Sequence, residues 1–277
     1  MTTGPVSSRR LTQQSGRYIR ETPGSRSLER GLALLRAFRP GTSMLTNAEL
    51  AERTGLPRPT VSRLTRSLVD SGFLAFDLRD RAYRLTAVFL SLAQAFQNEA
   101  PELDAALPLM KRVAEGHKIN VGLAVPDRYE MIYLSSVRES RLGIFRHIFA
   151  GSRNAIELTA LGRAYLASLT KPQRQTILEG IAPKYGPAWP VLQKEIDDAV
   201  VHVRQHGYCV REWPGMVSIA APLTAPDHAQ YSANISFAFT TGEYAGQVER
   251  YAPMLLDLTR QIQLAWQAGF AARPPSN

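Results

Sequence analysis

The sequence predicts an α+β chain of two domains, a small helical domain with a β-hairpin followed by a larger domain with a mainly antiparallel sheet. Three observations predict this. Apolar residues recur with helical spacing between residues 28 and 68, and after Gly72 the period changes to two. Beyond residue 100, paired strand-like segments and helical segments are mixed without an internal repeat. The length of 277 residues suits about two domains.

The first two helices have recognisable ends. The segment SLERGLALLRAF predicts a helix with Ser27 as its N-cap and one apolar face, formed by Leu28, Leu32, Leu35 and Phe38. The segment TNAELAERTG predicts a second helix, because Thr46 and Glu49 have the spacing of a capping box and Gly55 is typical of a helix end.

The segment TGLPRPTVSRLTRSL predicts the third helix. Its apolar stripe is Val61, Leu64 and Leu68, and Pro57 is tolerated in its first turn. The short strands FLAF and AYRL follow around the charged turn DLRDR. Three short helices and a hairpin in this order predict a winged helix-turn-helix over residues 26–86.

The polar face of the third helix carries cations and hydroxyls but no acid. Arg58 and Arg63 can read guanine in the major groove, and Arg66 is placed for a phosphate contact. We therefore predict an interface with double-stranded DNA, formed by Arg58, Pro59, Thr60, Ser62, Arg63 and Arg66 on the helix and by Arg79 and Arg81 on the hairpin turn.

The charge of the chain supports this interface. Residues 1–100 hold 15 arginines, no lysine and 8 acids, whereas residues 101–277 have a net charge of only +2. A basic segment favours a polyanionic partner, because each phosphate contact releases counterions. Residues 1–25 are expected to form a flexible basic arm, which either touches DNA or has no role.

The rest of the chain predicts a linker helix over residues 87–100 and a second domain over 101–277. Its expected helices are PELDAALPLMKRVAEG, TALGRAYLASL, WPVLQKEIDDAVVHVRQH and a last one around APMLLDLTRQIQLAWQAG. Its expected strands are INVGLAV, YEMIYLSS, RLGIFRHIFA, GMVSIAAPL and YSANISFAFT.

Composition excludes several other classes of protein. One cysteine cannot form an intrachain disulfide, and neither a secretory signal nor a run of about 18 apolar residues is present, so we expect a cytoplasmic protein without a membrane partner. His202 and His206 have the i, i+4 spacing of a metal pair, with Cys209 nearby, but no clear fourth ligand follows. We expect neither a metal nor a cofactor.

The order and wording of these segments resemble the IclR family of bacterial transcription regulators. The similarity rests on SLERGLALLRAF, LTNAELAERTGLPRPTVSRLTRSLVDSGFL, YRLT, TALGRAYLA and GMVSIAAPL, which with their connections span residues 27 to about 265. The resemblance implies a winged helix that binds operator DNA and a GAF-like C-terminal domain that binds a small effector. It also implies a homodimer or a dimer of dimers.

The resemblance also implies where the effector binds. The turn into the helix TALGRA presents backbone N–H groups to an anionic ligand, at Thr159, Ala160, Leu161 and Gly162. Ser218 and Ser236 face the ligand from two strands, with Met216 as an adaptable wall. Leu161 and Ala238 make this site less polar than the family pattern, which favours a carboxylate with an aromatic or larger apolar tail. Plain core packing is the alternative for each of these residues.

Two other functions compete with a ligand-responsive regulator. One is an enzyme with a DNA-tethering domain, although GxSxG, P-loop and HExxH motifs are missing and Cys209 has no recognisable activating partner. The other is a sequence-independent chromosome binder, which leaves the second domain unexplained.

Overall fold

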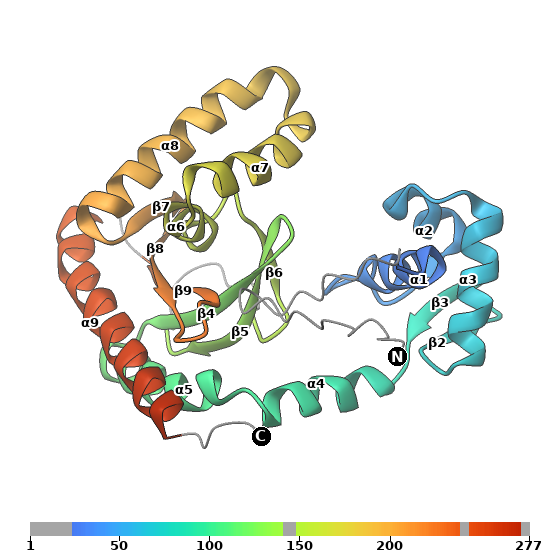
Figure 1. The fold of residues 1–277 in the computed structure, drawn as a ribbon, viewed down its shortest axis with the longest axis horizontal. Coiled ribbons are helices and arrows are strands. Elements are labelled where there is room, and N and C mark those ends of the chain that lie inside the picture. Colours follow the sequence, from blue (N-terminus) through green and yellow to red (C-terminus); the bar gives the residue numbers. More distant parts are fainter. Residues whose placement is uncertain (1–23, 141–147, 239–243, 273–277) are drawn as a thin grey trace, which may run out of the picture. The chain divides into compact units, whose positions relative to one another are not determined.

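The structure, a computed structural model, describes residues 24–140, 148–238 and 244–272 (Figure 1). The chain divides into two compact units on either side of the bond between Ala100 and Pro101. Each unit is described by itself below. Nearly all of the expected basic arm, residues 1–25, lies outside the described residues.

The first unit is a winged helix-turn-helix, as the sequence predicts. Its elements are α1 (Arg26–Arg36), β1 (Leu45–Thr46), α2 (Asn47–Thr54), α3 (Arg58–Asp70), β2 (Leu74–Asp77), β3 (Ala82–Leu85) and α4 (Val88–Asn98). The strands form an antiparallel sheet in the order β1-β3-β2. Its core is apolar, with Leu34, Leu45, Leu50 and Val61 fully buried.

Local sequence signals set both ends of α2 and the start of α1. Thr46 and Glu49 form the predicted capping box of α2, and Gly55 ends that helix with a φ of 68°. The predicted cap of α1 is wrong, because the hydroxyl of Ser25, and not that of Ser27, accepts a hydrogen bond from an amide of the first turn. The short strand β1 was also not predicted.

The predicted apolar face of α1 is partly wrong. Leu28 and Leu32 are 63% and 50% exposed, whereas Leu34 is completely buried. Leucines occur on two sides of this helix, so its sequence allows two apolar faces. Packing against α3 buries the face that contains Leu34 and leaves the face of Leu28 and Leu32 exposed.

The second unit is an α+β domain built on one antiparallel sheet. Its strands are β4 (Asn120–Asp127), β5 (Glu130–Arg138), β6 (Arg153–Ala155), β7 (Cys209–Trp213), β8 (Met216–Thr224) and β9 (Gln230–Ala238), in the order β6-β5-β4-β9-β8-β7. Its helices are α5 (Pro101–His117), α6 (Ala160–Ser168), α7 (Lys171–Ile181), α8 (Trp189–His206) and α9 (Tyr244–Ala271), with short 3-10 turns at Ala182–Lys184 and Gly186–Ala188. Every pairing between these strands is antiparallel, which confirms the predicted fold class.

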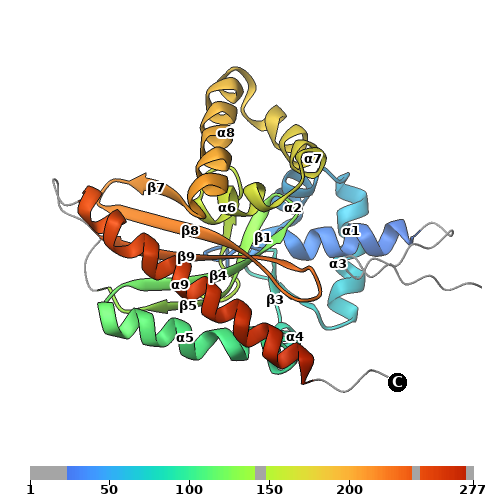
Figure 2. The same ribbon diagram turned by 60° about the vertical axis from the view of Figure 1, so that its left-hand side comes forward.

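Helices cover both faces of this sheet. Helices α5 and α9 lie along one face, where Val121, Ile219 and Ile235 enter the core (Figures 1 and 2). Helix α6 lies against the other face, with α8 packed on it, and this second core includes Ala124 and Cys209. The side chains along each strand therefore alternate between two different cores.

Three elements of this unit were not predicted, namely β6, α7 and β7. The strand expected at residues 141–150 falls mostly outside the described residues, and residues 148–150 are not in a strand. The other predicted helices and strands of the unit are confirmed with small shifts at their ends, except that α9 begins at Tyr244, well before the predicted segment APMLLDLTRQIQLAWQAG.

In the described part of the chain, no helix is both long enough and apolar enough to span a membrane. Within the same residues, no group of three or more histidine, cysteine or acidic side chains is placed to hold a metal ion.

Candidate DNA-binding and effector-binding sites

Helix α3 has one buried face and one exposed cationic face. Val61 and Leu64 are buried in the core of the unit, and Leu68 is half-buried. Arg58, Arg63 and Arg66 are exposed, and among the described residues none of the three has an ion pair or a side-chain hydrogen bond. Pro59 is exposed beside them, and Thr60 is half-buried. Three free guanidinium groups on one exposed helix are suited to contact phosphates and base edges.

Ser62 holds α3 against the preceding helix. The Asn47 Nδ2 atom, in the first turn of α2, donates a hydrogen bond to Ser62 Oγ at 3.3 Å. The hydroxyl thus has a structural partner and is also exposed. Sequence reasoning gave Ser62 a DNA contact and missed its role in orienting α3 on α2.

The hairpin between β2 and β3 presents the two predicted arginines of the wing. Arg79 and Arg81 are exposed, without an acid partner within the described chain. One carboxylate oxygen of Asp77 accepts hydrogen bonds from the amides of Arg79 and Asp80, at 2.9 Å and 3.0 Å. Asp77 therefore stabilises the turn. This role explains why an acid is present beside cations at a predicted DNA contact.

The predicted anion-binding turn lies at the N-terminus of α6, and part of its hydrogen-bonding capacity is used. The Gly162 amide donates to Thr159 Oγ1 at 3.2 Å, so the Thr159 hydroxyl already caps this helix. Ala160 and Leu161 are 1% and 2% exposed and belong to the core between α6 and the sheet. An anion would have to displace the Thr159 hydroxyl to use the Gly162 amide.

Ser218 and Ser236 are direct neighbours on the sheet. They form a cross-strand pair between β8 and β9, with their side chains 6% and 8% exposed. Met216 lies two residues before Ser218 on the same face and is half-buried. The start of α6 is close to the two serines. Cys209 pairs with Ala220, two residues along β8 from Ser218, and its thiol donates a hydrogen bond to the Ala160 carbonyl at 3.2 Å.

The two serines belong to a longer polar row. Strand register places one residue from each of five strands side by side, in the order Arg138, Asn120, Ser236, Ser218, Arg211. Directly opposed residues in antiparallel strands point to the same face. We call these five residues the polar row. It crosses the face that α6 covers and has an arginine at each end.

A buried tyrosine extends the polar row. Asn234 Nδ2 donates to Ser218 Oγ at 3.0 Å, and the Tyr133 hydroxyl donates to Asn234 Oδ1 at 3.4 Å. Gly122 makes room for this contact, since a Cβ at its position would lie 2.4 Å from the Tyr133 ring. Burial raises the pKa of Tyr133 to about 12, so its hydroxyl is a neutral hydrogen-bond donor at neutral pH.

The two arginines of the polar row differ in their partners. Arg211 Nη1 donates to Glu195 Oε2 at 3.1 Å, and Glu195 also accepts from the buried Arg163. The Nε atom of Arg211 is buried without a hydrogen-bond partner among the described residues. Burial lowers the pKa of Arg138, which has no acid partner within the same residues. The row therefore carries positive charge that the described acids only partly neutralise.

Sequence reasoning found two members of the polar row and missed the other three. The alternation of Ser232, Asn234 and Ser236 along an otherwise apolar strand was a usable signal for a polar face. Arg138, Asn120 and Arg211 could not be found in this way, because their neighbours come from strands far apart in the sequence.

The histidines considered for metal binding have other contacts. The ring centroids of His202 and His206 are 4.5 Å apart, and the His202 ring also packs against Tyr208. Cys209 is buried in the core beneath α6, and burial raises the pKa of its thiol to about 12. A buried, protonated thiol that donates to a carbonyl is a poor metal ligand and a poor nucleophile.

The fold and these surfaces define a class of protein, a transcriptional regulator with an N-terminal DNA-binding unit. Comparisons with known families agree. Residues 27–78 match the family described as IclR helix-turn-helix domain, and residues 99–264 match that described as bacterial transcriptional regulator IclR C-terminal. The chain belongs to the IclR family of transcriptional regulators.

Individual relatives support this assignment. The chain is 32% identical over 262 residues to the HTH-type transcriptional regulator TsaQ1/TsaQ2 of Comamonas testosteroni, covering 90% of both chains. Its fold matches an IclR family transcriptional regulator from Brucella abortus with a TM-score of 0.79 at 33% identity, over 87% of this chain and 92% of that one. It also shares its fold with an IclR homologue from Microbacterium hydrocarbonoxydans complexed with 4-hydroxybenzoate, with a TM-score of 0.66 at 19% identity, over 87% and 99% of the two chains.

Proposed function

We propose that this regulator binds a specific operator through α3 and the wing, and that a small carboxylate bound in its second unit controls its activity. The polar row is the observation that carries the second half of this proposal. The regulator acts by binding and not by catalysis. It acts in the bacterial cytoplasm, where its operator is found. Its effector is a compound of a catabolic pathway.

The unpaired arginines of α3 support sequence-specific binding. Arg58 and Arg63 are free to form bidentate hydrogen bonds with guanine, while Arg66, further along the helix, meets phosphate. Arg79 and Arg81 add contacts from the wing to phosphate or the minor groove. Arg63→Ala is expected to weaken specific binding by about 1–3 kcal/mol and to relax one base preference.

The polar row supports an anionic effector. Asn120, Ser218 and Ser236 in the row are buried, and burying polar side chains side by side costs free energy unless partners compensate for their lost hydration. A carboxylate in contact with Ser218, Ser236 and the nearer guanidinium supplies such partners. Leu161 and Met216 provide apolar walls, which favour an aromatic carboxylate over a very small one. The compound bound in the Microbacterium homologue, 4-hydroxybenzoate, is therefore a reasonable first candidate.

Exposed apolar side chains in the first unit support assembly as a homodimer or a dimer of dimers. Among the described residues, none of those in α4 is buried, and Leu90, Leu92 and Phe96 are each more than half exposed. Leu28 and Leu32 add apolar surface on α1. A second copy of this chain would cover these side chains and bring two winged helices to a pseudo-palindromic operator.

A fluorescence anisotropy titration tests the proposal. The full chain is titrated with the DNA that flanks its own gene and with scrambled DNA of equal length, at several salt concentrations. Each titration is repeated with a panel of aromatic and short aliphatic carboxylates. The expected result is tight binding to the flanking DNA alone, shifted by one compound. Equal, steeply salt-dependent binding to both DNAs would contradict sequence-specific recognition.

A variant separates the two binding functions. Ser218→Phe fills the polar row and is expected to abolish the response to the carboxylate while operator affinity is unchanged. Leu264→Phe, at an exposed position of α9, is the matched control. Loss of both functions in Ser218→Phe would show that Ser218 is part of the structural core and would refute the proposed effector site.

A further inference from the structure

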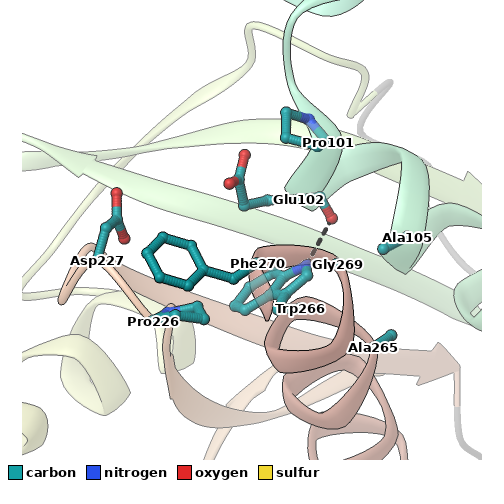
Figure 3. Close-up of a pocket in the computed structure, with 9 residues that line it drawn as sticks. All are labelled: Pro101, Glu102, Ala105, Pro226, Asp227, Ala265, Trp266, Gly269 and Phe270. Carbon is teal, nitrogen blue, oxygen red and sulfur yellow. Dashed lines mark hydrogen bonds between the residues drawn. The ribbon is translucent and has the colours of Figure 1, made fainter. Parts of the chain in front are cut away.

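A separate pocket lies at one end of the second unit. It is formed by the start of α5, the last turns of α9 and the turn between β8 and β9 (Figure 3). None of the residues proposed to bind the effector lines it. Its wall includes Trp266, whose ring belongs to the core that α5 and α9 form on the opposite face of the sheet from the polar row. The pocket and the polar row are therefore distinct sites.

The aromatic part of the pocket is firmly held. Trp266 is 4% exposed, its Nε1 atom donates to the Glu102 carbonyl at 2.7 Å, and its ring packs on Tyr231 with centroids 4.7 Å apart. Phe270 lies one turn further along α9 and is 53% exposed. The pocket thus has a rigid base and one aromatic ring open to a ligand.

Two acidic side chains line the pocket together with the exposed ring. In Figure 3 the carboxyl groups of Glu102 and Asp227 lie on the same side of the Phe270 ring. Asp227 accepts a hydrogen bond from the Ala229 amide, and neither acid has an ion pair with a described basic residue. The pKa of Tyr231 is raised to about 12, first by burial and then by the charges of Glu102 and Asp227. Both negative charges are therefore close enough to act on the Tyr231 hydroxyl.

Ordinary structural roles do not explain this arrangement. An acid in the first turn of a helix, such as Glu102, is favoured by the helix dipole, and an aspartate such as Asp227 is common in turns. Neither role requires that the two acids share a pocket with an exposed aromatic ring.

We propose that this pocket binds a small organic cation, an ammonium or guanidinium group on a short apolar stem. The cationic group lies between the carboxylates of Glu102 and Asp227, which supply charge-assisted hydrogen bonds. The face of Phe270 attracts the same charge through its ring electrons, and Pro226 and Trp266 contact the stem. The regulator therefore has a site for a cation in addition to its proposed site for an anion.

Calorimetric titration of the full chain in the absence of DNA tests the proposal. The probe is benzylammonium, and benzyl alcohol is its neutral counterpart of similar shape. Saturable binding of benzylammonium alone is expected. Asp227→Asn keeps an oxygen for the Ala229 amide, and Glu102→Gln keeps the shape of the pocket. Each is expected to weaken binding about tenfold, because each removes one charged partner. Glu115→Gln, an exposed site on the same helix α5, is the matched control and should not change the affinity.

Several results would overturn the proposal. No saturable binding of benzylammonium, or equal binding of benzyl alcohol, would rule out a cation site. Unchanged affinity in Asp227→Asn and Glu102→Gln would place the probe elsewhere. Arg273 follows α9 and lies outside the described residues, so Arg273→Ala is titrated as well. Binding that occurs only in this variant would identify the arginine of the chain itself as the occupant. None of these results depends on DNA binding or on the carboxylate effector.

Discussion

Gly162 shows how one residue can fix the position of a helix. Helix α6 rests so closely on the preceding loop that a Cβ at Gly162 would lie 2.1 Å from the carbonyl oxygen of Ile156. Such a distance is impossible, and the atom it would meet belongs to the backbone and cannot turn away. The residue is part of the TALGRA turn, so the same close approach positions the predicted anion-binding turn on the sheet.

We predict that Gly162→Ala destabilises the second unit. The added methyl must push α6 away from the loop, at a cost of about 1–3 kcal/mol in the free energy of unfolding. Gly116→Ala is the control, because Gly116 is also helical but a Cβ there meets nothing within 4 Å. That change should be neutral or stabilise by up to about 1 kcal/mol. Denaturant unfolding measures both, and equal stability of the two variants would contradict the close packing of α6.

His202 gives the chain a pH-dependent contribution to stability. Its pKa is lowered, first by burial and then by the charge of His206. The unfolded chain, in which histidine has a pKa of about 6.5, therefore binds more protons than the folded chain just below that pH. The contribution of His202 to the free energy of unfolding is fully present above about pH 6.5. It is lost as the pH falls through the pKa that His202 has in the folded chain.

We predict that His202→Gln flattens the pH dependence of stability in this window. Denaturant unfolding between about pH 5 and pH 7 should show a smaller rise for the variant than for the wild type. His117→Gln, at the exposed end of α5, serves as the control and should keep the wild-type slope. A wild-type slope in His202→Gln would mean that this histidine titrates alike in the folded and unfolded chain.

At the scale of elements, the wing shows how local chemistry shapes a predicted contact surface. Asp77 caps the turn from one side, and Arg81 closes it with a φ of 49°, in the left-handed region. A non-glycine residue in this region costs free energy that glycine avoids. Arg81 is thus a costly choice for the turn itself, as expected for a side chain that is needed at the surface.

We predict that Arg81→Gly separates the stability of the wing from its DNA contact. Glycine adopts the same φ without strain, so the stability of the first unit should be unchanged or slightly higher. Affinity for all DNA sequences should fall, and the slope of its salt dependence should decrease by about 1, because one phosphate contact is lost. Anisotropy titrations at several salt concentrations measure this slope. An unchanged slope would place Arg81 outside the interface.

Elements with complete local signals were predictable, and elements that depend on distant partners were not. Thr46, Glu49 and Gly55 mark both ends of α2 by themselves, so the sequence predicted that helix correctly. The strand β1 has two residues and exists because Leu45 and Thr46 pair with Tyr83 and Ala82, far along the chain. Strand β7 likewise exists because it pairs with β8, where Ala220 is the partner of its first residue, Cys209.

The same distinction applies to the two candidate sites. Helical spacing alone places Arg58, Arg63 and Arg66 away from the apolar stripe, so the sequence is sufficient to identify the exposed face. The polar row depends on the register of five strands, and residues 120 and 236 become neighbours only when β4 pairs with β9. Ser218 and Ser236 were found through the resemblance to the family and not through their spacing.

At the scale of the whole molecule, the first unit has an apolar helix surface that its described residues do not cover. The sheet of the second unit is covered by helices on both faces, whereas no residue of α4 is buried in the part of the chain that the structure describes. Exposing several large apolar residues on one short helix is unfavourable in water. Two half-sites in an operator also require two winged helices. The surface of α4 and the geometry of an operator therefore favour the same assembly.

We predict that the double variant Leu92→Ser, Phe96→Ser shifts the protein towards a monomer. These residues are one helical turn apart on α4, and both are more than half exposed in the single chain, so serine there should not unfold the first unit. Sedimentation measured at several protein concentrations reports the assembly. Operator affinity should fall as the assembly is lost, because the second half-site is no longer bound by a linked copy. Leu264→Ser, equally exposed on α9, is the control and should keep the wild-type mass. If the double variant sediments as the wild type does, α4 is not the surface between copies, and its apolar side chains need another partner.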